Sequence, residues 1–123
     1  MDGKLIREDG QILYEMSQIG KFDSFEIWIY GGEIPVPHFH LITGNQKSPE
    51  FETCIKIKEA EYFHHSGKEG ALNSKEKKRL IEFLQKPHHK LSGTNWEILV
   101  AQWGMNNPKY DIPFIEIPNY REL

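Results

Sequence analysis

Two histidines, His38 and His40, are spaced in this sequence so that their side chains could bind one ligand together. They belong to the segment Val36–Leu41, whose β-branched and aromatic residues are typical of a strand. In a β-strand, residues i and i+2 point to the same face, so both imidazoles would project from one side of a sheet. Two imidazoles on one face can share a metal ion. The pattern therefore predicts a candidate divalent-metal site at His38 and His40.

A mononuclear site needs more ligands than two imidazoles. The candidates follow the next predicted strand and could return beside His38: Glu59, Glu61, His64 and His65. The spacing fixes none of them, and two other interpretations stay open. The pair can consist of polar strand residues bonded to neighbouring side chains or carbonyls, or it can serve in acid–base chemistry or ligand contact without a metal. Because no third ligand is fixed, the sequence favours a structural role.

The sequence gives less support for a functional role of its cysteine and its other histidines. Cys54 is the one cysteine, which excludes an intramolecular disulfide and a cysteine-rich zinc site. A catalytic thiol needs a nearby base that lowers its pKa, and the sequence around Cys54 shows none, so we predict a buried or half-buried strand residue. The remaining histidines are expected in loops or solvated turns: His64, His65, His88 and His89.

Two surface features could bind a partner. Trp28 and Tyr30 would share the sheet face opposite their apolar neighbours, where an exposed aromatic patch could bind a protein. The basic run Lys75–Arg79 lies in a predicted helix, where we expect it to form the solvated face. A weaker alternative is nucleic-acid contact through Lys75, Lys77, Lys78 and Arg79.

Composition predicts one globular domain over residues 1–123. The chain is 38% hydrophobic and 27% charged, and a chain of this length holds a core without disulfides. Its net charge of −3 argues against a dedicated nucleic-acid binder, which would usually be strongly basic. The first residues have no apolar signal region and no run of about 18 apolar residues occurs, so we expect no membrane span and a cytoplasmic location.

The first half of the chain predicts strands. Residues Phe25–Tyr30 alternate between the two faces with β-branched and aromatic side chains, which makes this the clearest strand. Asp9-Gly10 is a turn signal between two short apolar runs. Two further strands are predicted at His38–Thr43 and Phe51–Lys58, with a polar loop over Gly44–Pro49 between them.

The second half predicts two helices. Asn73 has Glu76 three residues on, the spacing of a capping box, and Pro87 should end this helix. Thr94 and Glu97 repeat the spacing. One face of this second helix carries the apolar residues Trp96, Leu99, Val100 and Trp103. Gly104 is a natural end for it.

Strands followed by helices indicate an α+β fold. We expect an antiparallel meander of about four or five strands with the two C-terminal helices packed on one face. The tail Ile112–Ile117 either adds an edge strand or packs over the core.

The strand Phe25–Tyr30, the motif Pro37-His38-Phe39-His40 and the closing Asn95-Trp96 helix resemble the bacterial domain-of-unknown-function family 4160 and its relatives. The resemblance covers roughly residues 24–103, although Gly44–Glu50 and His64–Leu72 look longer than the family pattern. It implies a small bacterial protein, often encoded beside toxin–antitoxin or mobile-element genes. It carries over no catalytic residue.

Two classes of function follow from these residues. A binding or regulatory module, with a protein partner at Trp28 and Tyr30, is favoured because no complete catalytic constellation is visible. The alternative is a metal-binding protein or metal-dependent enzyme centred on His38 and His40, for which His64 and Glu61 are the further ligands to test.

Overall fold

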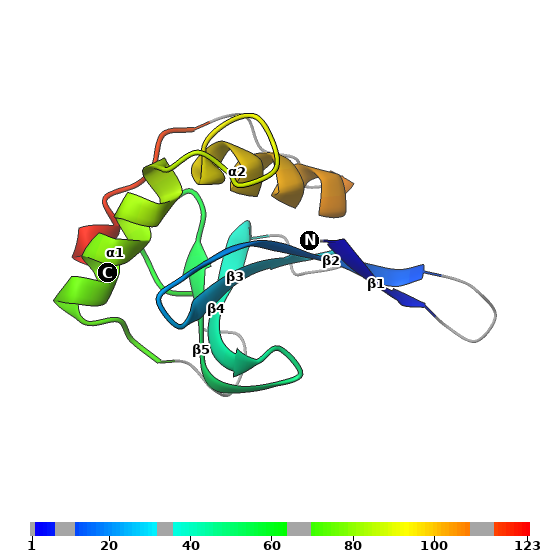
Figure 1. Ribbon diagram of the computed structural model, residues 1–123, viewed down its shortest axis with the longest axis horizontal. Coiled ribbons are helices and arrows are strands. Elements are labelled where there is room, and N and C mark those ends of the chain that lie inside the picture. Colours follow the sequence, from blue (N-terminus) through cyan, green and yellow to red (C-terminus); the bar gives the residue numbers. More distant parts are fainter. Residues whose placement is uncertain (1, 7–11, 32–35, 64–69, 109–114) are drawn as a thin grey trace.

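The computed structural model describes residues 2–6, 12–31, 36–63, 70–108 and 115–123. Five antiparallel strands form one sheet in the order of the sequence (Figure 1). The strands are β1 (Asp2–Ile6), β2 (Ile12–Phe22), β3 (Phe25–Tyr30), β4 (His38–Asn45) and β5 (Ser48–Lys56). Two helices follow, α1 (Ser74–Gln85) and α2 (Asn95–Asn106), and a short 3-10 helix, η2 (Tyr120–Glu122), lies near the C-terminus. The predicted α+β architecture is confirmed.

The helices cover one face of the sheet, which we call the helix face. Helix α2 packs on β2 and β3, and α1 packs on β2 and η2 (Figure 1). Alternate residues of β3, namely Phe25, Ile27 and Ile29, are buried in the core with Phe39 and Leu41 of β4. The period of two therefore separates the apolar core from a second face, which carries His40 and which we call the histidine face.

Among the described residues, strands β3 and β4 are paired over three residues each, from Glu26↔Ile42 to Trp28↔His40. Carbonyls at the end of β3 are bonded to the end of α2: the side-chain amide of Asn106 donates to Ile29 O at 3.4 Å, and that of Asn107 donates to Tyr30 O at 3.0 Å. The start of β4 lies near the same helix, since His38 contacts Trp103 of α2.

The β4–β5 connection differs from the prediction. The prediction of a polar loop over Gly44–Pro49 is wrong. The two strands stay paired as far as Asn45↔Ser48, and only Gln46 and Lys47 form the turn. Gly44 has φ of 82° at a register shift, a conformation that glycine adopts without strain. The Asn45 side chain accepts a hydrogen bond from the Lys47 amide at 2.9 Å. Glycine and asparagine here make a tight hairpin rather than a loop.

The predicted caps of both helices are confirmed. Asn73 and Glu76 bond each other's backbone amides at the start of α1, and Thr94 and Glu97 do so at the start of α2. Helix α1 ends at Gln85, just before Pro87, as predicted. The predicted apolar face of α2 is buried, and it comprises Trp96, Leu99, Val100 and Trp103.

Helix α2 does not end at Gly104, as the sequence suggested, but runs to Asn106. The amides of Asn106 and Asn107 explain the extension, since both bond to the sheet, and Asn107 also donates to Trp103 O at 3.2 Å. Tertiary hydrogen bonds thus outweigh the low helix propensity of one glycine.

The C-terminal segment closes the core. Ile115 and Ile117 pack against it without forming a strand, and Trp96 Nε1 donates to Ile115 O at 2.7 Å. The buried Tyr120 hydroxyl donates to Lys56 O at 2.9 Å and Ile57 O at 3.1 Å, which fixes η2 against the end of β5. The first part of the predicted tail segment and the Asp9-Gly10 turn lie outside the described residues. No helix among the described residues is long and apolar enough to cross a membrane.

Candidate metal centre

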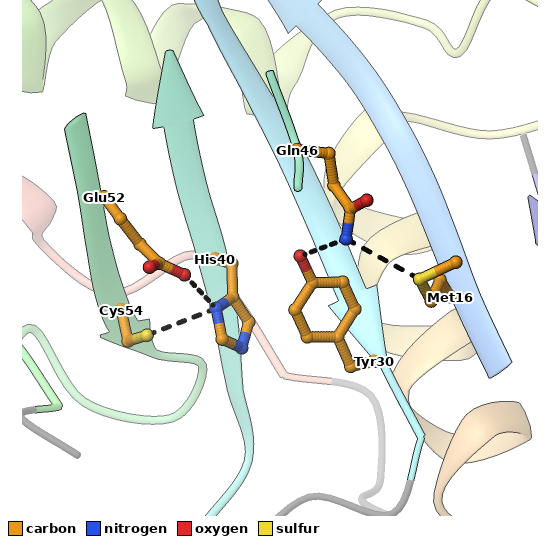
Figure 2. Close-up of polar contacts among 6 residues, drawn as sticks. All are labelled: Met16, Tyr30, His40, Gln46, Glu52 and Cys54. Carbon is orange, nitrogen blue, oxygen red and sulfur yellow. Dashed lines mark hydrogen bonds and ion pairs between the residues drawn. The ribbon is translucent and has the colours of Figure 1, made fainter. Parts of the chain in front are cut away.

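The tight β4–β5 hairpin sets which residues face each other across the two strands. His40 pairs with Cys54, and His38 pairs with Lys56. Directly opposite residues in an antiparallel pair share a face, so the Cys54 thiol projects beside the His40 imidazole (Figure 2). The register thus adds a sulfur ligand to the two histidines that the sequence predicts to share a face.

Three metal-ligand side chains converge on the histidine face. His38, His40 and Cys54 each offer one ligand atom, a ring nitrogen or the sulfur, and these three atoms lie within 4.8 Å of one another. The three residues are only 1%, 4% and 0% exposed. A tetrahedral zinc with ordinary Zn–N and Zn–S bonds separates its donors by about 3.3–3.6 Å. Side-chain rotations that close the group by about 1 Å would therefore complete three corners of such a site.

Hydrogen bonds at Nδ1 orient both imidazoles. His38 Nδ1 lies 2.7 Å from the carbonyl oxygen of Val36, which can only accept, so this nitrogen carries the proton. His40 Nδ1 lies 3.1 Å from the Glu52 carboxylate. In the His38 ring the lone pair is then on Nε2. Histidines that ligate metals are oriented in this way, by a carbonyl or a carboxylate on the second ring nitrogen.

The Cys54 sulfur lies 3.4 Å from His40 Nδ1. The sequence around Cys54 shows no base, but strand pairing brings His40, 14 positions away, beside it. The thiol is buried, as expected. Sulfur and the carboxylate both face Nδ1, so His40 does not link them in the way a catalytic triad links its nucleophile and its acid through opposite ring nitrogens. The arrangement suits metal ligation better than nucleophilic catalysis.

Aromatic side chains enclose the three donors. The Tyr30 ring centroid is 4.3 Å from that of His40, and the Phe63 ring is 4.8 Å from His38. Trp103 of α2 also contacts His38, with ring centroids 5.5 Å apart. This apolar shell holds the imidazoles in place and lowers the local dielectric around them.

The β4–β5 turn folds over the histidine face. Gln46 donates to the Tyr30 hydroxyl at 3.0 Å, and its amide nitrogen lies 3.6 Å from the Met16 sulfur on β2 (Figure 2). Strands β2, β3 and β4 are thus linked by one side chain from the turn. The sheet curls, and Tyr30 is held against His40.

The other predicted ligands are placed elsewhere. The Glu61 carboxylate forms an ion pair with Lys56 at 2.6 Å and is 61% exposed, and Glu59 lies 3.9 Å from the same ammonium group. These carboxylates raise the pKa of Lys56, chiefly through the hydrogen bond with Glu61. Neither glutamate is in the group formed by His38, His40 and Cys54. His64 and His65 lie outside the described residues.

Trp28 and Tyr30 lie on the histidine face, as the alternation indicates, but both are half-buried. Trp28 Nε1 donates to Glu26 at 2.9 Å, and the two aromatic rings are 6.4 Å apart. Tyr30 is engaged with His40 and Gln46. The two residues therefore form a wall beside the candidate centre rather than an exposed patch.

Cys54 and Glu52 belong to the candidate site but were not assigned to it from the sequence. A signal was present, because both occupy the polar side of the alternating segment that follows the histidine strand. What was missing was the register, which depends on the two-residue turn.

Comparison with protein-family models, curated proteins and solved structures finds no match to this chain.

Proposed function

We propose that this chain is a metal-binding module that holds one Zn²⁺-like transition-metal ion at His38, His40 and Cys54. The observation that carries the proposal is the convergence of three buried donors from two paired strands. Imidazole and thiolate are the ligand types that Zn²⁺ prefers. Burying such groups costs free energy unless they are bonded, and coordination to a metal would offset that cost.

Under this proposal each residue has a defined role. Cys54 binds as a thiolate, and its proton leaves when the metal enters. His38 binds through Nε2, while Val36 O accepts from its Nδ1 and holds the ring. His40 binds through Nδ1, the nitrogen that lies 3.4 Å from the Cys54 sulfur and 3.1 Å from Glu52, in the tautomer that carries its proton on Nε2. The described residues provide three ligands, and a tetrahedral ion takes one more from another group or from water.

A binding or regulatory role, which the lack of a complete catalytic constellation favours, fits this arrangement. Tyr30 contacts the His40 ring directly and shares the histidine face with Trp28. Rotation of His40 onto a metal would move Tyr30, so we propose that metal occupancy controls the half-buried surface at Trp28 and Tyr30 where a protein partner would bind. Capture of a partner by the zinc-loaded protein, abolished by EDTA or by Trp28→Ala, tests this second step.

Elemental analysis of protein purified without a histidine tag tests the metal site. We expect one equivalent of zinc after dialysis, and less than a tenth of that in His38→Ala/His40→Ala. His89→Gln is the matched control, because His89 is an exposed histidine outside the cluster and its loss should leave the zinc content unchanged. Substoichiometric metal that the double variant leaves unaltered would refute the proposal.

Titration with Co²⁺ identifies the ligands, because tetrahedral cobalt absorbs in the visible and a cobalt–thiolate bond adds a near-ultraviolet band. We expect both features at one equivalent, and loss of the near-ultraviolet band in Cys54→Ala. Circular dichroism of each apo variant separates a lost ligand from a lost fold. A near-ultraviolet band that persists in Cys54→Ala would exclude the thiolate ligand.

A further inference from the structure

A cleft of about 520 Å³ lies on another part of the molecule, between the β2–β3 turn and the chain that leaves α1. Lys21 and Phe22 of β2 line one side, and Phe83, Lys86 and Lys90 line the other. Its volume is within the range of sites for small molecules. The cleft shares no residue with the metal-ligand group, so it must be explained separately.

The cleft is positively charged although the chain carries a net charge of −3. Lys21, Lys86 and Lys90 are all exposed, and in the described part of the chain none of them has an ion-pair partner. Arg79 also lines the cleft but is neutralised by Asp23, with hydrogen bonds of 2.9 and 3.2 Å. Three lysines without an ion-pair partner among the described residues therefore border one space, which favours an anionic ligand.

Two pKa shifts agree with this positive field. The hydrogen bonds from Arg79 lower the pKa of Asp23, and the charges of Lys75 and Lys86 add to that shift. Partial loss of water lowers the pKa of His89, and the neighbouring His88 and Lys90 lower it further. His89 lines the same cleft and is therefore mostly neutral at pH 7, available as an aromatic surface and hydrogen-bonding group.

The floor of the cleft is apolar. The rings of Phe22 and Phe83 stack with centroids 5.2 Å apart, and Phe83 lies directly over the backbone of Gly20. A Cβ atom at Gly20 would come within 2.6 Å of the Phe83 ring, so glycine is what allows this close approach. An apolar floor below a cationic rim suits a ligand that has both a hydrophobic body and a negative group.

The loop that carries His89 and Lys90 is anchored by His88. Its Nε2 donates to Ile19 O at 3.0 Å, and its Nδ1 accepts from the backbone amides of Lys90 at 3.1 Å and Leu91 at 3.0 Å. The last carbonyls of α1 are also satisfied, because the Asn95 side chain donates to Phe83 O and its backbone amide to Lys86 O, both at 2.8 Å. The lysines are therefore placed by a fixed backbone and not occupied in capping the helix.

We propose that this cleft binds a small organic phosphate. The phosphate groups would lie among Lys21, Lys86 and Lys90, and the apolar or aromatic part of the ligand would pack on Phe83. Ammonium groups are common phosphate ligands, and charge-assisted hydrogen bonds to phosphate are about twice as strong as neutral ones. The proposal does not depend on the metal site.

Nuclear magnetic resonance titration of the full chain in EDTA tests the site, with pyrophosphate, adenosine diphosphate and adenosine as probes. We expect saturable amide shifts at Gly20, Lys21 and Lys90 with both phosphate compounds, tighter binding of adenosine diphosphate, and no saturable shift with adenosine. Affinity should fall as salt is added. Absence of saturable shifts with either phosphate compound at several millimolar, or equal binding of adenosine, would overturn the proposal.

Variants distinguish the cleft from general charge attraction. Lys86→Gln/Lys90→Gln should raise the Kd for pyrophosphate about tenfold through loss of two charge-assisted contacts. Lys58→Gln is the matched control, since it removes an exposed positive charge outside the cleft and should leave the Kd within about twofold. Equal weakening by the control would refute the site. A single-stranded oligonucleotide that shifts the cleft amides when pyrophosphate and adenosine diphosphate do not would replace it with a nucleic-acid site.

Discussion

Zinc should stabilise this protein against heat by a calculable amount. The ligands come from β4 and β5 and meet only when those strands pair, so the intact site exists only in the folded state. At a free zinc concentration 100 times the Kd, binding to the folded state alone adds about 2.7 kcal/mol to the free energy of unfolding. For 123 residues of ordinary unfolding entropy, this corresponds to a rise in Tm of about 10 °C.

Differential scanning calorimetry of the untagged protein measures this shift, in zinc-buffered solution and in EDTA. The EDTA scan of each variant gives its own baseline, so the loss of packing on mutation is separated from the loss of metal. We expect Cys54→Ala and His40→Gln to reduce the zinc-dependent rise to less than about 3 °C, and the control His89→Gln to keep it. An equal rise in all variants, or none in the native chain at saturating zinc, would refute the reasoning.

Three further predictions concern the fold. Tyr120→Phe removes the hydrogen bonds from the buried hydroxyl to the carbonyls of Lys56 and Ile57 and should cost about 1–2 kcal/mol in urea unfolding at pH 7. Burial raises the pKa of Tyr120, so its contribution is complete below about pH 10 and is lost at higher pH, a slope that the phenylalanine variant should lack. Asp23→Asn should lower the urea midpoint at pH 7, and the difference should disappear as pH falls through the lowered pKa of Asp23; a difference that persists at pH 2 would contradict the pairing with Arg79. Thr94→Ala should cost about 1 kcal/mol in the same assay through loss of the α2 cap, whereas the exposed Ser92→Ala should cost little.

The elements of this fold could be predicted because their signals are local. Alternation identified β3, and reciprocal caps identified the starts of both helices. The ends that depend on tertiary contacts could not be placed. Gly104 looked like the end of α2, but Asn106 and Asn107 bond to the sheet beyond it. Residues 44–49 looked like a loop, but pairing continues to Asn45.

The candidate metal centre was only half visible in the sequence for the same reason. His38 and His40 are two residues apart, so a strand places them on one face whatever its neighbour is. Cys54 joins them only through the register of the hairpin, and a shift of one residue would turn its side chain to the opposite face. Glu52 likewise reaches His40 across the strand pair, and its carboxylate explains the orientation of that ring.

X-ray absorption spectroscopy at the zinc edge of the untagged, zinc-loaded protein tests the central claim most directly. The account predicts one sulfur ligand at about 2.3 Å and at least two nitrogen ligands at about 2.0–2.1 Å, with imidazole outer-shell scattering. It also predicts that the sulfur contribution vanishes in Cys54→Ala. A first shell of nitrogen and oxygen alone in the native chain would contradict a site built from His38, His40 and Cys54.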